Sequence, residues 1–529
     1  MAVAPQRTMP LSADQIAKAV RTLFGAEAMD RALSSGTLNP IPAASRQFPP
    51  ALGGDVQLDA TSFAVRDSVG QLIGEYVREN FGSVTKCAAP TDACALAYLN
   101  ALASKAYRRD LTRDEQDALG ALFARLRSQE VDGYLVTATV EEATQHVAYA
   151  VMISPQFLWR YEIGDTPTTP PPLGSSTRTT RLTDDELASA VSFFLTDQAP
   201  DDELRAAARA RTLGGELDLH VARILEGATA RDWLRQSMEM RFLVNQLPLS
   251  PLDPRRWPVD DALLMSLQTS SRMFLDEVMW KGQLTDLLTS RVAFLDPRLA
   301  SQIYDLPNSL DAASGVFAKT MLPADRRSGL LTDAGFLTGL SYPGGILLFR
   351  RGRSAARMFT CARDLPRDTS LVTDQSEQEQ FRNLIDLTAS QQVAGRRRPE
   401  CVGCHEVGDA IGLVLDAYDP LGRFRTVGDL GGPVETSVNL PSAIGSGRVD
   451  DAVEMAAALA KDPAFVECMA TTLLAVALSD GSGAPWPEAG ACGPARVAAK
   501  YSEGEAQTFG ALVRATAASP AFALRVVAP

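Results

Sequence analysis

The sequence predicts a mainly α protein that is made of several helical modules. Apolar residues recur three and four positions apart along most of the chain, and alternating strand patterns are few. At 529 residues the chain is too long for one ordinary hydrophobic core, so we expect roughly three or four packed units. The apolar fraction of 46% and the charged fraction of 22% are those of a globular protein, not of a disordered one.

The charge balance argues against a nucleic-acid partner, and the hydropathy argues against a transmembrane segment. The net charge is −13, from 51 basic and 64 acidic residues, whereas nucleic-acid binding needs a basic surface. We therefore expect no nucleic-acid partner. No run of eighteen apolar residues occurs, so we also expect no transmembrane segment.

The first expected elements are an N-terminal helix and a helical module. Ser12 is a typical N-cap residue for a helix over 13–24, in which apolar side chains share one face. An irregular connector follows over 35–60, which is rich in Pro, Gly and Ser. The next module, 63–164, contains Ser154-Pro155, where the proline ends one helix. The same joint recurs at Asp462-Pro463 and Ser519-Pro520.

The next expected elements are a linker over 165–180 and a second helical module. The linker is rich in Pro, Thr, Ser and Gly and has no periodicity. Thr183 is the expected cap of the first of five helices, at about 185–197, 201–210, 216–228, 230–246 and 260–282. The predicted division of the whole chain is an N-terminal helix with its connector (1–62), helical modules (63–164 and 181–305), a loop-rich module (306–450) and a C-terminal helical module (451–529).

The C-terminal third contains the motif on which the function depends. Cys401-Val402-Gly403-Cys404-His405 has the Cys-x-x-Cys-His spacing of a c-type haem attachment site. Each thiol forms a thioether with one haem vinyl group, and the adjoining imidazole of His405 becomes the proximal iron ligand. We therefore expect one covalent haem c in a cytochrome c-like segment.

Two other uses of these cysteines fit the sequence less well. A zinc site needs two further ligands, and the chain has no second Cys-x-x-Cys and no His-x-x-x-His. A thioredoxin-like redox pair needs a βαβ context, which a helical chain does not offer.

The chain resembles one family along nearly its whole length. Ala106 to Thr112 and Ser154 to Glu162 are similar to the first module of the planctomycete-type cytochrome c-like proteins, whose modules are largely of unknown function. Arg181 to Ala188 and Pro200 to Leu204 resemble the second module. The third resemblance is carried by Gly329 to Thr332, Arg351 to Arg353, Cys401 to His405, Asp409 to Leu413 and Tyr418 to Arg423, and a fourth runs from Asp451 to Phe522. The resemblance implies a covalent haem and no particular reaction.

Several residues are candidates for hydrogen bonds to the haem propionates and to His405. Arg423 and Arg425 follow the motif, and Arg396 to Arg398 precede it; guanidinium groups fit the carboxylates of haem propionates. Solvated surface ion pairs are the alternative for each of these arginines. Asp409, Asp416 or a backbone carbonyl is expected to orient the Nδ1–H of His405.

The sixth iron ligand decides the class of function. Met455 and Met469 are candidates, because methionine is the usual ligand in small electron carriers; a core position is the alternative for both. His146 is interpreted first as a core histidine and second as a ligand or distal acid–base group, and His220 is a weaker candidate. If the distal side is open, the irregular stretch 306–350 could line the access route, and Tyr342 and Arg350 are its catalytic candidates.

The remaining cysteines predict the compartment. Cys87 with Cys94 and Cys468 with Cys492 are the expected disulfides, and Cys361 is left as a buried thiol. Seven reduced cysteines in a cytosolic protein are the alternative. Because covalent haem attachment normally takes place outside the bacterial cytoplasm, we expect a periplasmic or extracellular protein whose export signal is absent from this numbering.

Three functional hypotheses follow. The first is a c-type haem oxidoreductase, peroxidase- or oxygenase-like, that acts on an organic substrate or on peroxide. The second is a non-catalytic electron-transfer cytochrome with a six-coordinate haem and a redox partner. The third is an interaction protein in which the haem is an accessory. The lack of nucleotide-binding, zinc-protease and serine-hydrolase motifs leaves these three open.

Overall fold

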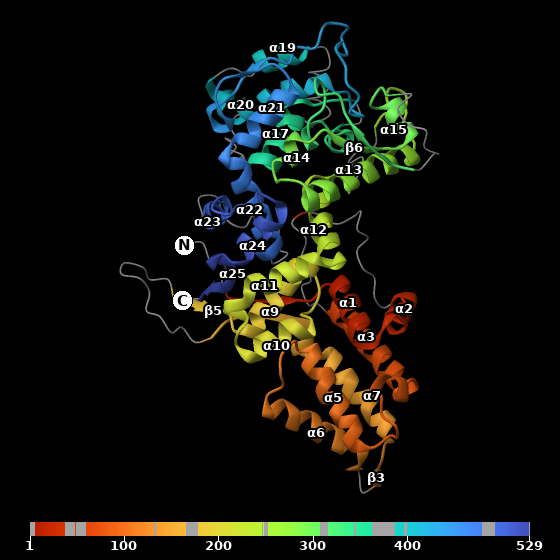
Figure 1. Cartoon of the computed structure of the whole chain (residues 1–529). Coiled ribbons are helices and arrows are strands. Elements are labelled where there is room, and N and C mark those ends of the chain that lie inside the picture. Colours follow the sequence, from red (N-terminus) through yellow and green to blue (C-terminus); the bar gives the residue numbers. More distant parts are fainter. Residues whose placement is uncertain are drawn as a thin grey trace.

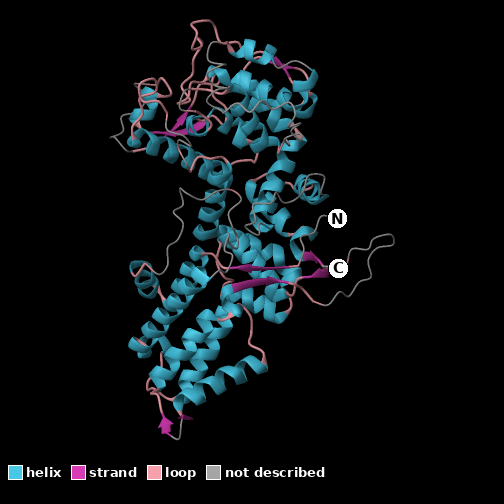
Figure 2. Cartoon of the chain, turned by 180° about the vertical axis from the view of Figure 1, so that it is seen from behind, coloured by secondary structure: helices cyan, strands magenta, loops and turns pink. Residues whose placement is uncertain are grey.

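The structure is a computed structural model, and it confirms the mainly α class. It describes residues 6–36, 48, 60–131, 134–165, 178–245, 247, 252–306, 316–342, 345–361, 387–395, 399–478 and 492–527; side chains at 60–62, 131, 134, 395, 399–404 and 492 are outside the description. Helices dominate, and the strands form short antiparallel pairs (Figure 2). Most of the expected connector 35–60 and linker 165–180 lies outside the described residues. Within the described residues no helix is long and apolar enough to cross a membrane.

The helices are arranged in three tiers along the long axis of the molecule (Figure 1). We call the N-terminal tier the lower lobe, and it has its own hydrophobic core. Its elements are β1 (Arg7–Pro10), α1 (Ala13–Phe24), α2 (Ala26–Ser34), α3 (Ala60–Glu79), α4 (Phe81–Thr85), α5 (Asp92–Ala106), α6 (Arg113–Arg127), β2 (Gln129–Val131), β3 (Tyr134–Val136), α7 (Val140–Ile153), α8 (Pro155–Leu158) and β4 (Trp159–Glu162).

The middle tier combines the second module with the C-terminal helices. Its elements are β5 (Thr179–Arg181), α9 (Asp184–Thr196), α10 (Asp202–Ala210), α11 (Leu213–Glu226), α12 (Ala228–Arg241), α22 (Pro463–Leu478), α23 (Cys492–Ser502), α24 (Phe509–Ala517), α25 (Pro520–Ala523) and β10 (Leu524–Val526). Segments far apart in sequence meet here, because β5 pairs with β10.

The upper lobe contains the Cys-x-x-Cys-His segment. Its elements are α13 (Asp261–Lys281), α14 (Asp286–Thr289), β6 (Val292–Leu295), α15 (Pro297–Gln302), β7 (Ala318–Met321), η2 (Leu330–Thr332), α16 (Ala334–Gly339), α17 (Leu348–Thr360), α19 (Ala389–Gly395), α20 (Pro399–Val414), η4 (Leu415–Ala417), β8 (Val438–Asn439), η5 (Ser442–Ile444), β9 (Arg448–Val449) and α21 (Ala452–Lys461). One large core runs through the middle tier into this lobe.

Local sequence signals set the helix starts. Ser12 caps α1 and Thr183 caps α9, and in each case the residue at the third helical position, Gln15 or Glu186, completes a capping box. The five helices predicted in the second module are all present, with ends shifted by a few residues. The proline joints are also confirmed, since Pro155, Pro463 and Pro520 each occupy the first position of a new helix.

A buried carboxylate fastens the lower lobe to the chain ends. Glu162 on β4 accepts hydrogen bonds from Arg7 at 2.7 Å and from Arg525, and Arg160 lies 3.3 Å from it. Burial opposes ionisation of this carboxyl group, but the charges of Arg7, Arg525 and Arg160 outweigh that effect and lower its pKa. This cluster connects β1, β4 and β10.

One predicted disulfide is confirmed and the other is wrong. Cys87 and Cys94 are joined, with their Cα atoms 6.0 Å apart. Cys468, however, pairs with Cys361 and not with Cys492, so Cys361 is not a free thiol. Cys361 is the C-cap of α17, which lies beside α22 and brings the two sulfurs together. The pairing depends on packing of segments 107 residues apart, which closeness in sequence does not reveal.

Candidate functional site

The Cys-x-x-Cys-His segment lies in helix α20. The backbone is helical from Pro399 to Val414, so positions 401, 404 and 405 lie on one face, three and four residues apart. The side chains of Cys401 and Cys404 are outside the described residues. His405 is described, and its side chain is 26% exposed.

Helix α20 is positioned by unusually close packing against α17. A Cβ atom added at Gly352 of α17 would lie 1.9 Å from the carbonyl oxygen of Gly408 and 2.3 Å from the nitrogen of Gly412. Glycine at these positions lets the two backbones touch without an intervening layer of side chains. The place of His405 is therefore set by main-chain contact between two helices.

A buried arginine fixes the same pair of helices at the end of α20. Arg351 of α17 has no exposed surface, and it donates hydrogen bonds to the carbonyl oxygens of Leu415, Tyr418 and Asp419 and to the Ser341 hydroxyl. Burial lowers the pKa of Arg351 to about 10, which leaves it protonated at neutral pH. Arg351 thus holds the turn after α20 against α17.

His405 lines a cavity of about 420 Å³, which is within the size range of ligand pockets. The walls come from α19, α20 and the β8–β9 pair. The lining residues are Val393, His405, Glu406, Asp409, Ala410, Ser437, Val438, Asn439, Pro441 and Arg448.

The imidazole of His405 is held between an aromatic ring and a carboxylate. The ring of Phe349, on α17, has its centroid 3.9 Å from that of the imidazole. Asp409 is one turn further along α20, and its Oδ1 lies 3.9 Å from Nδ1, which is beyond hydrogen-bond distance. Nδ1 is buried and has no hydrogen-bond partner among the described residues. Asp416, the other expected partner, instead accepts a hydrogen bond from Arg425 at 2.6 Å.

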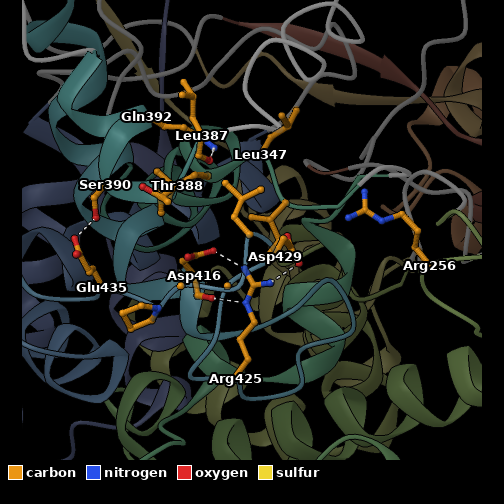
Figure 3. Close-up of a pocket in the computed structure, with 17 residues that line it drawn as sticks. Arg256, Leu347, Leu387, Thr388, Ser390, Gln392, Asp416, Arg425, Asp429 and Glu435 are labelled. Atoms are coloured by element: carbon orange, nitrogen blue, oxygen red, sulfur yellow. Dashed lines mark hydrogen bonds and ion pairs between the residues drawn. The ribbon is translucent and has the colours of Figure 1, made fainter.

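The two arginines predicted to bind propionates lie outside the His405 cavity. Arg423 pairs with Asp419 at 2.5 Å. Arg425 is held between Asp416 and Asp429 and lines a second, smaller pocket, in which Ser390 also donates a hydrogen bond to Glu435 (Figure 3). Arg396 to Arg398 are outside the described residues. The basic residue in the His405 cavity is Arg448, which sequence reasoning missed because it follows the motif by more than forty residues and belongs to a two-residue strand.

Met455 and Met469 do not line the cavity. Met455 on α21 and Met469 on α22 are buried in the large core, with 0% and 1% exposure. Among the described residues that line the cavity, none is a methionine and none is a second histidine.

The other two histidines lie in other tiers. His146 is on α7 of the lower lobe, at the opposite end of the molecule from α20 (Figure 1). It is exposed, so its interpretation as a core histidine is wrong. His220 on α11 is buried, with Glu216 3.8 Å from Nε2 and Glu203 4.0 Å from Nδ1.

Tyr342 and Arg350 are brought together by the fold. The guanidinium carbon of Arg350 lies 4.3 Å from the centroid of the Tyr342 ring, a cation–π contact. Arg350 directly follows Phe349, the residue that packs on His405. Neither Tyr342 nor Arg350 is among the residues that line the His405 cavity.

The described residues at the cavity are compatible with a haem beside His405, and the thiols that would attach it belong to side chains outside the description. A histidine at the wall of a ligand-sized cavity, with a buried ring nitrogen that has no hydrogen-bond partner, follows two cysteine positions on the same helical face. Arg448 supplies a cation at the cavity wall, although its exposed side chain also pairs with Asp450 at 2.9 Å. The Phe349 ring supports the imidazole from the side of α17.

The fold is that of a mainly α protein, and the sequence contains one Cys-x-x-Cys-His motif. Three successive regions match family models, each described as a protein of unknown function: residues 94–162 match PSD5 (DUF1595), residues 182–306 match PSD4 (DUF1592), and residues 327–428 match PSCyt3 (DUF1588). The three matches fit a planctomycete cytochrome c-like modular protein. No curated protein and no solved structure matches the chain.

Proposed function

We propose that this protein is an exported c-type haem oxidoreductase, which carries one haem attached to Cys401 and Cys404 and acts on an organic substrate or on peroxide. The observation that supports it most directly is the place of His405 at the wall of a 420 Å³ cavity, on the helical face that also includes positions 401 and 404. When bound, the haem supplies redox chemistry at iron. The two disulfides agree with an oxidising compartment such as the periplasm or the extracellular space.

The residues of the chain have distinct roles in this proposal. His405 is the proximal ligand, Phe349 limits rotation of its ring, and Asp409 places a negative charge near its Nδ1. Arg448 is the candidate partner for a propionate, with Arg423 and Arg425 as the earlier candidates, although both of these are paired with carboxylates. The α17–α20 contact keeps this set in one place.

A distal side without a protein ligand would favour catalysis over simple electron transfer, and two observations support this interpretation. Met455 and Met469 are buried in the large core, and the described cavity walls offer no other histidine or methionine. A six-coordinate electron carrier with a redox partner is the alternative, and the partial exposure of His405 would suit it. A distal side without a protein ligand would leave room for a small molecule at iron.

One spectrum separates these two functions. We expect the ferrous protein to bind carbon monoxide readily, with a shift of its Soret band. A low-spin ferrous spectrum that carbon monoxide does not change would indicate a tightly held sixth ligand and would favour electron transfer. Met455→Leu and Met469→Leu then identify that ligand, because only loss of the ligand makes the spectrum sensitive to carbon monoxide.

A second experiment tests the haem itself. The double change Cys401→Ala/Cys404→Ala is expected to abolish covalent haem, measured by haem staining after denaturing electrophoresis. The matched control is Cys87→Ala/Cys94→Ala, which removes the disulfide of the lower lobe and is expected to leave the stain intact. Covalent haem that survives the first double change would refute the assignment.

Unchanged turnover in Tyr342→Phe and Arg350→Ala would remove both residues from the catalytic candidates.

A further inference from the structure

The disulfide between Cys361 and Cys468 is in contact with a half-buried positive charge, the guanidinium of Arg241. The Nη2 atom of Arg241, the last residue of α12, lies 3.6 Å from the Sγ of Cys361 and 3.5 Å from the Sγ of Cys468. The same nitrogen donates to the carbonyl oxygens of Arg357 and Met358, at 2.6 and 3.3 Å, which fixes its position. Three segments from different parts of the chain therefore meet at this bond.

The guanidinium of Arg241 has no carboxylate partner among the described residues. Its side chain is half-buried, and its Nε is enclosed and makes no hydrogen bond within the part of the chain that the structure describes. Burial lowers the pKa of Arg241 to about 10, and the nearby charge of Arg357 acts in the same direction. A negative charge next to Arg241 would therefore be strongly favoured, and the two sulfurs are the groups in contact that can acquire one.

We propose that Cys361–Cys468 is a redox-active disulfide that exchanges with dithiols, and that Arg241 is its positioning residue, which stabilises the reduced form by binding a thiolate. This site is separate from the haem proposal and does not depend on it. Stabilisation of the reduced form makes a disulfide more oxidising, so we expect this bond to be reduced more readily than Cys87–Cys94.

The unequal burial of the two cysteines sets the direction of the exchange. Cys361 is half-buried, whereas Cys468 is 1% exposed, so in this proposal Cys361 is the cysteine that an incoming thiolate attacks. The new sulfur–sulfur bond forms there, the Cys361–Cys468 bond breaks, and its electron pair leaves on Cys468 as a thiolate beside Arg241. The second thiol of the reductant, once deprotonated, attacks the mixed disulfide and releases Cys361. The dithiol is thereby oxidised to a disulfide, Cys361 takes up one proton, and the other proton goes to solvent while Cys468 stays ionised.

The molecule contains its own control for this proposal. In the other disulfide, Cys87 is 8% exposed and Cys94 is half-buried, so the two bonds are similarly accessible. No guanidinium lies within hydrogen-bond distance of Cys87 or Cys94 among the described residues. Because the two bonds close loops of different length, with sequence separations of 7 and 107, the charge at Arg241 is isolated by comparing each bond with itself in an Arg241 variant.

The reduction equilibria of both bonds can be measured in one sample. The folded full-length protein, with Cys492→Ser to remove one further thiol, is equilibrated with graded ratios of reduced and oxidised dithiothreitol, quenched in acid and alkylated. Peptide mass spectrometry then reads these two bonds separately from Cys401 and Cys404. We expect the equilibrium constant for reduction of Cys361–Cys468 to be at least tenfold larger than that of Cys87–Cys94, which is about 30 mV for a two-electron couple. Equal constants, or a smaller one for Cys361–Cys468, would overturn the proposal.

Substitution of the arginine separates its charge from its packing. Arg241→Gln is expected to remove most of the tenfold difference, and Arg241→Lys, which keeps a positive charge, to retain part of it. Neither variant should move the constant of Cys87–Cys94. An unchanged constant for Cys361–Cys468 in a folded Arg241→Gln variant would refute the role of Arg241, and if that variant does not fold, the comparison of the two bonds in the parent protein still decides the main proposal.

Discussion

The lower and upper lobes share two structural features, a close helix crossing at glycine and a buried arginine that binds backbone carbonyls. The two lobes differ in what these features position. In the lower lobe α3 crosses α7, and a Cβ added at Gly74 would lie 2.8 Å from the carbonyl oxygen of Gln145. In the upper lobe α17 crosses α20 with glycines on both helices, and the added Cβ at Gly352 would lie only 1.9 Å from Gly408. The first crossing leaves room for side chains such as Tyr149, whereas in the second the backbones touch.

Each lobe also contains a buried arginine that binds backbone carbonyls. Arg108 of the lower lobe donates to Ala106, Gln156, Phe157 and Trp159, and Arg351 of the upper lobe donates to Leu415, Tyr418 and Asp419. Burial lowers the pKa of Arg108 to about 9 and that of Arg351 to about 10. The difference is what these arginines hold, because only Arg351 fixes the helix that carries His405. We infer that the lower lobe is a scaffold and that the upper crossing determines the site.

The largest effect is expected from Gly352→Ala, because the added methyl group forces the two backbones of the upper crossing apart. Strong overpacking costs about 3 kcal/mol or more, and we expect at least that loss in the free energy of unfolding, together with loss of the proposed haem site. Chemical denaturation followed by circular dichroism measures the first effect, and haem staining measures the second.

The matched control is Gly215→Ala on α11, where an added Cβ meets no atom within 4 Å. This change is expected to stabilise the protein by roughly 0.5–1 kcal/mol, because alanine is the better helix former. If Gly352→Ala were as well tolerated as Gly215→Ala, main-chain contact would not be what positions α20.

Arg351→Met and Arg108→Met test the buried arginines that bind backbone carbonyls, and we expect the next largest effects from them. Each change leaves several buried carbonyls without their donor, for an expected loss of about 2–4 kcal/mol in the free energy of unfolding. The two variants should differ in the spectrum of the haem-loaded protein. We expect Arg351→Met to alter it and Arg108→Met to leave it unchanged. Equal spectral changes in both variants would show that the lower lobe is coupled to the site.

Signals close together in the sequence predicted most of the fold. Ser12 and Thr183 predicted the starts of their helices, because an N-cap and its hydrogen-bond partner are only three residues apart. The prolines at 155, 463 and 520 predicted joints for the same reason, since a proline acts on the turn that precedes it.

Features that depend on tertiary packing could not be predicted in this way. Cys361–Cys468 and the cavity residue Arg448 come from segments far apart along the chain. The motif predicted His405 as the centre of the site, but neither the contact with Phe349 nor the close approach at Gly352 has a local signature. His146 was predicted to be a core residue because alanines lie on both sides of it on helix α7. The face of α7 that is buried is a neighbouring one, which leaves His146 exposed.

Gly74→Ala tests the helix crossing of the lower lobe, and we expect its effect on stability to be intermediate. The added Cβ approaches the Gln145 carbonyl oxygen at 2.8 Å, and a shift of α3 away from α7 can relieve this contact. We expect a loss of about 1–2 kcal/mol in the free energy of unfolding, less than for Gly352→Ala, and no change in the haem spectrum. A loss equal to that of Gly352→Ala would mean that both crossings are equally rigid.

The smallest effect is expected where the lower lobe meets the middle tier. Asp110, which precedes α6, accepts two hydrogen bonds from Arg209 of α10, at 2.8 and 2.9 Å, and both side chains are 57% exposed. The hydrogen bond from Arg209 lowers the pKa of Asp110. Because the folded pKa is below the unfolded value of about 3.9, the stabilisation is complete above that value and is lost as the pH falls through the folded pKa.

Asp110→Asn is therefore expected to cost only about 0.2–1 kcal/mol at neutral pH, the usual worth of an exposed pair. The cost should shrink in high salt and vanish in acid, where the parent carboxylate is itself protonated. A double-mutant cycle with Arg209→Gln, measured by denaturation at neutral and acidic pH, isolates the pair. A coupling well above 1 kcal/mol, or one that persists in acid, would mean that the lower lobe is bound to the middle tier by more than a solvated contact, and its description as a scaffold would then fail.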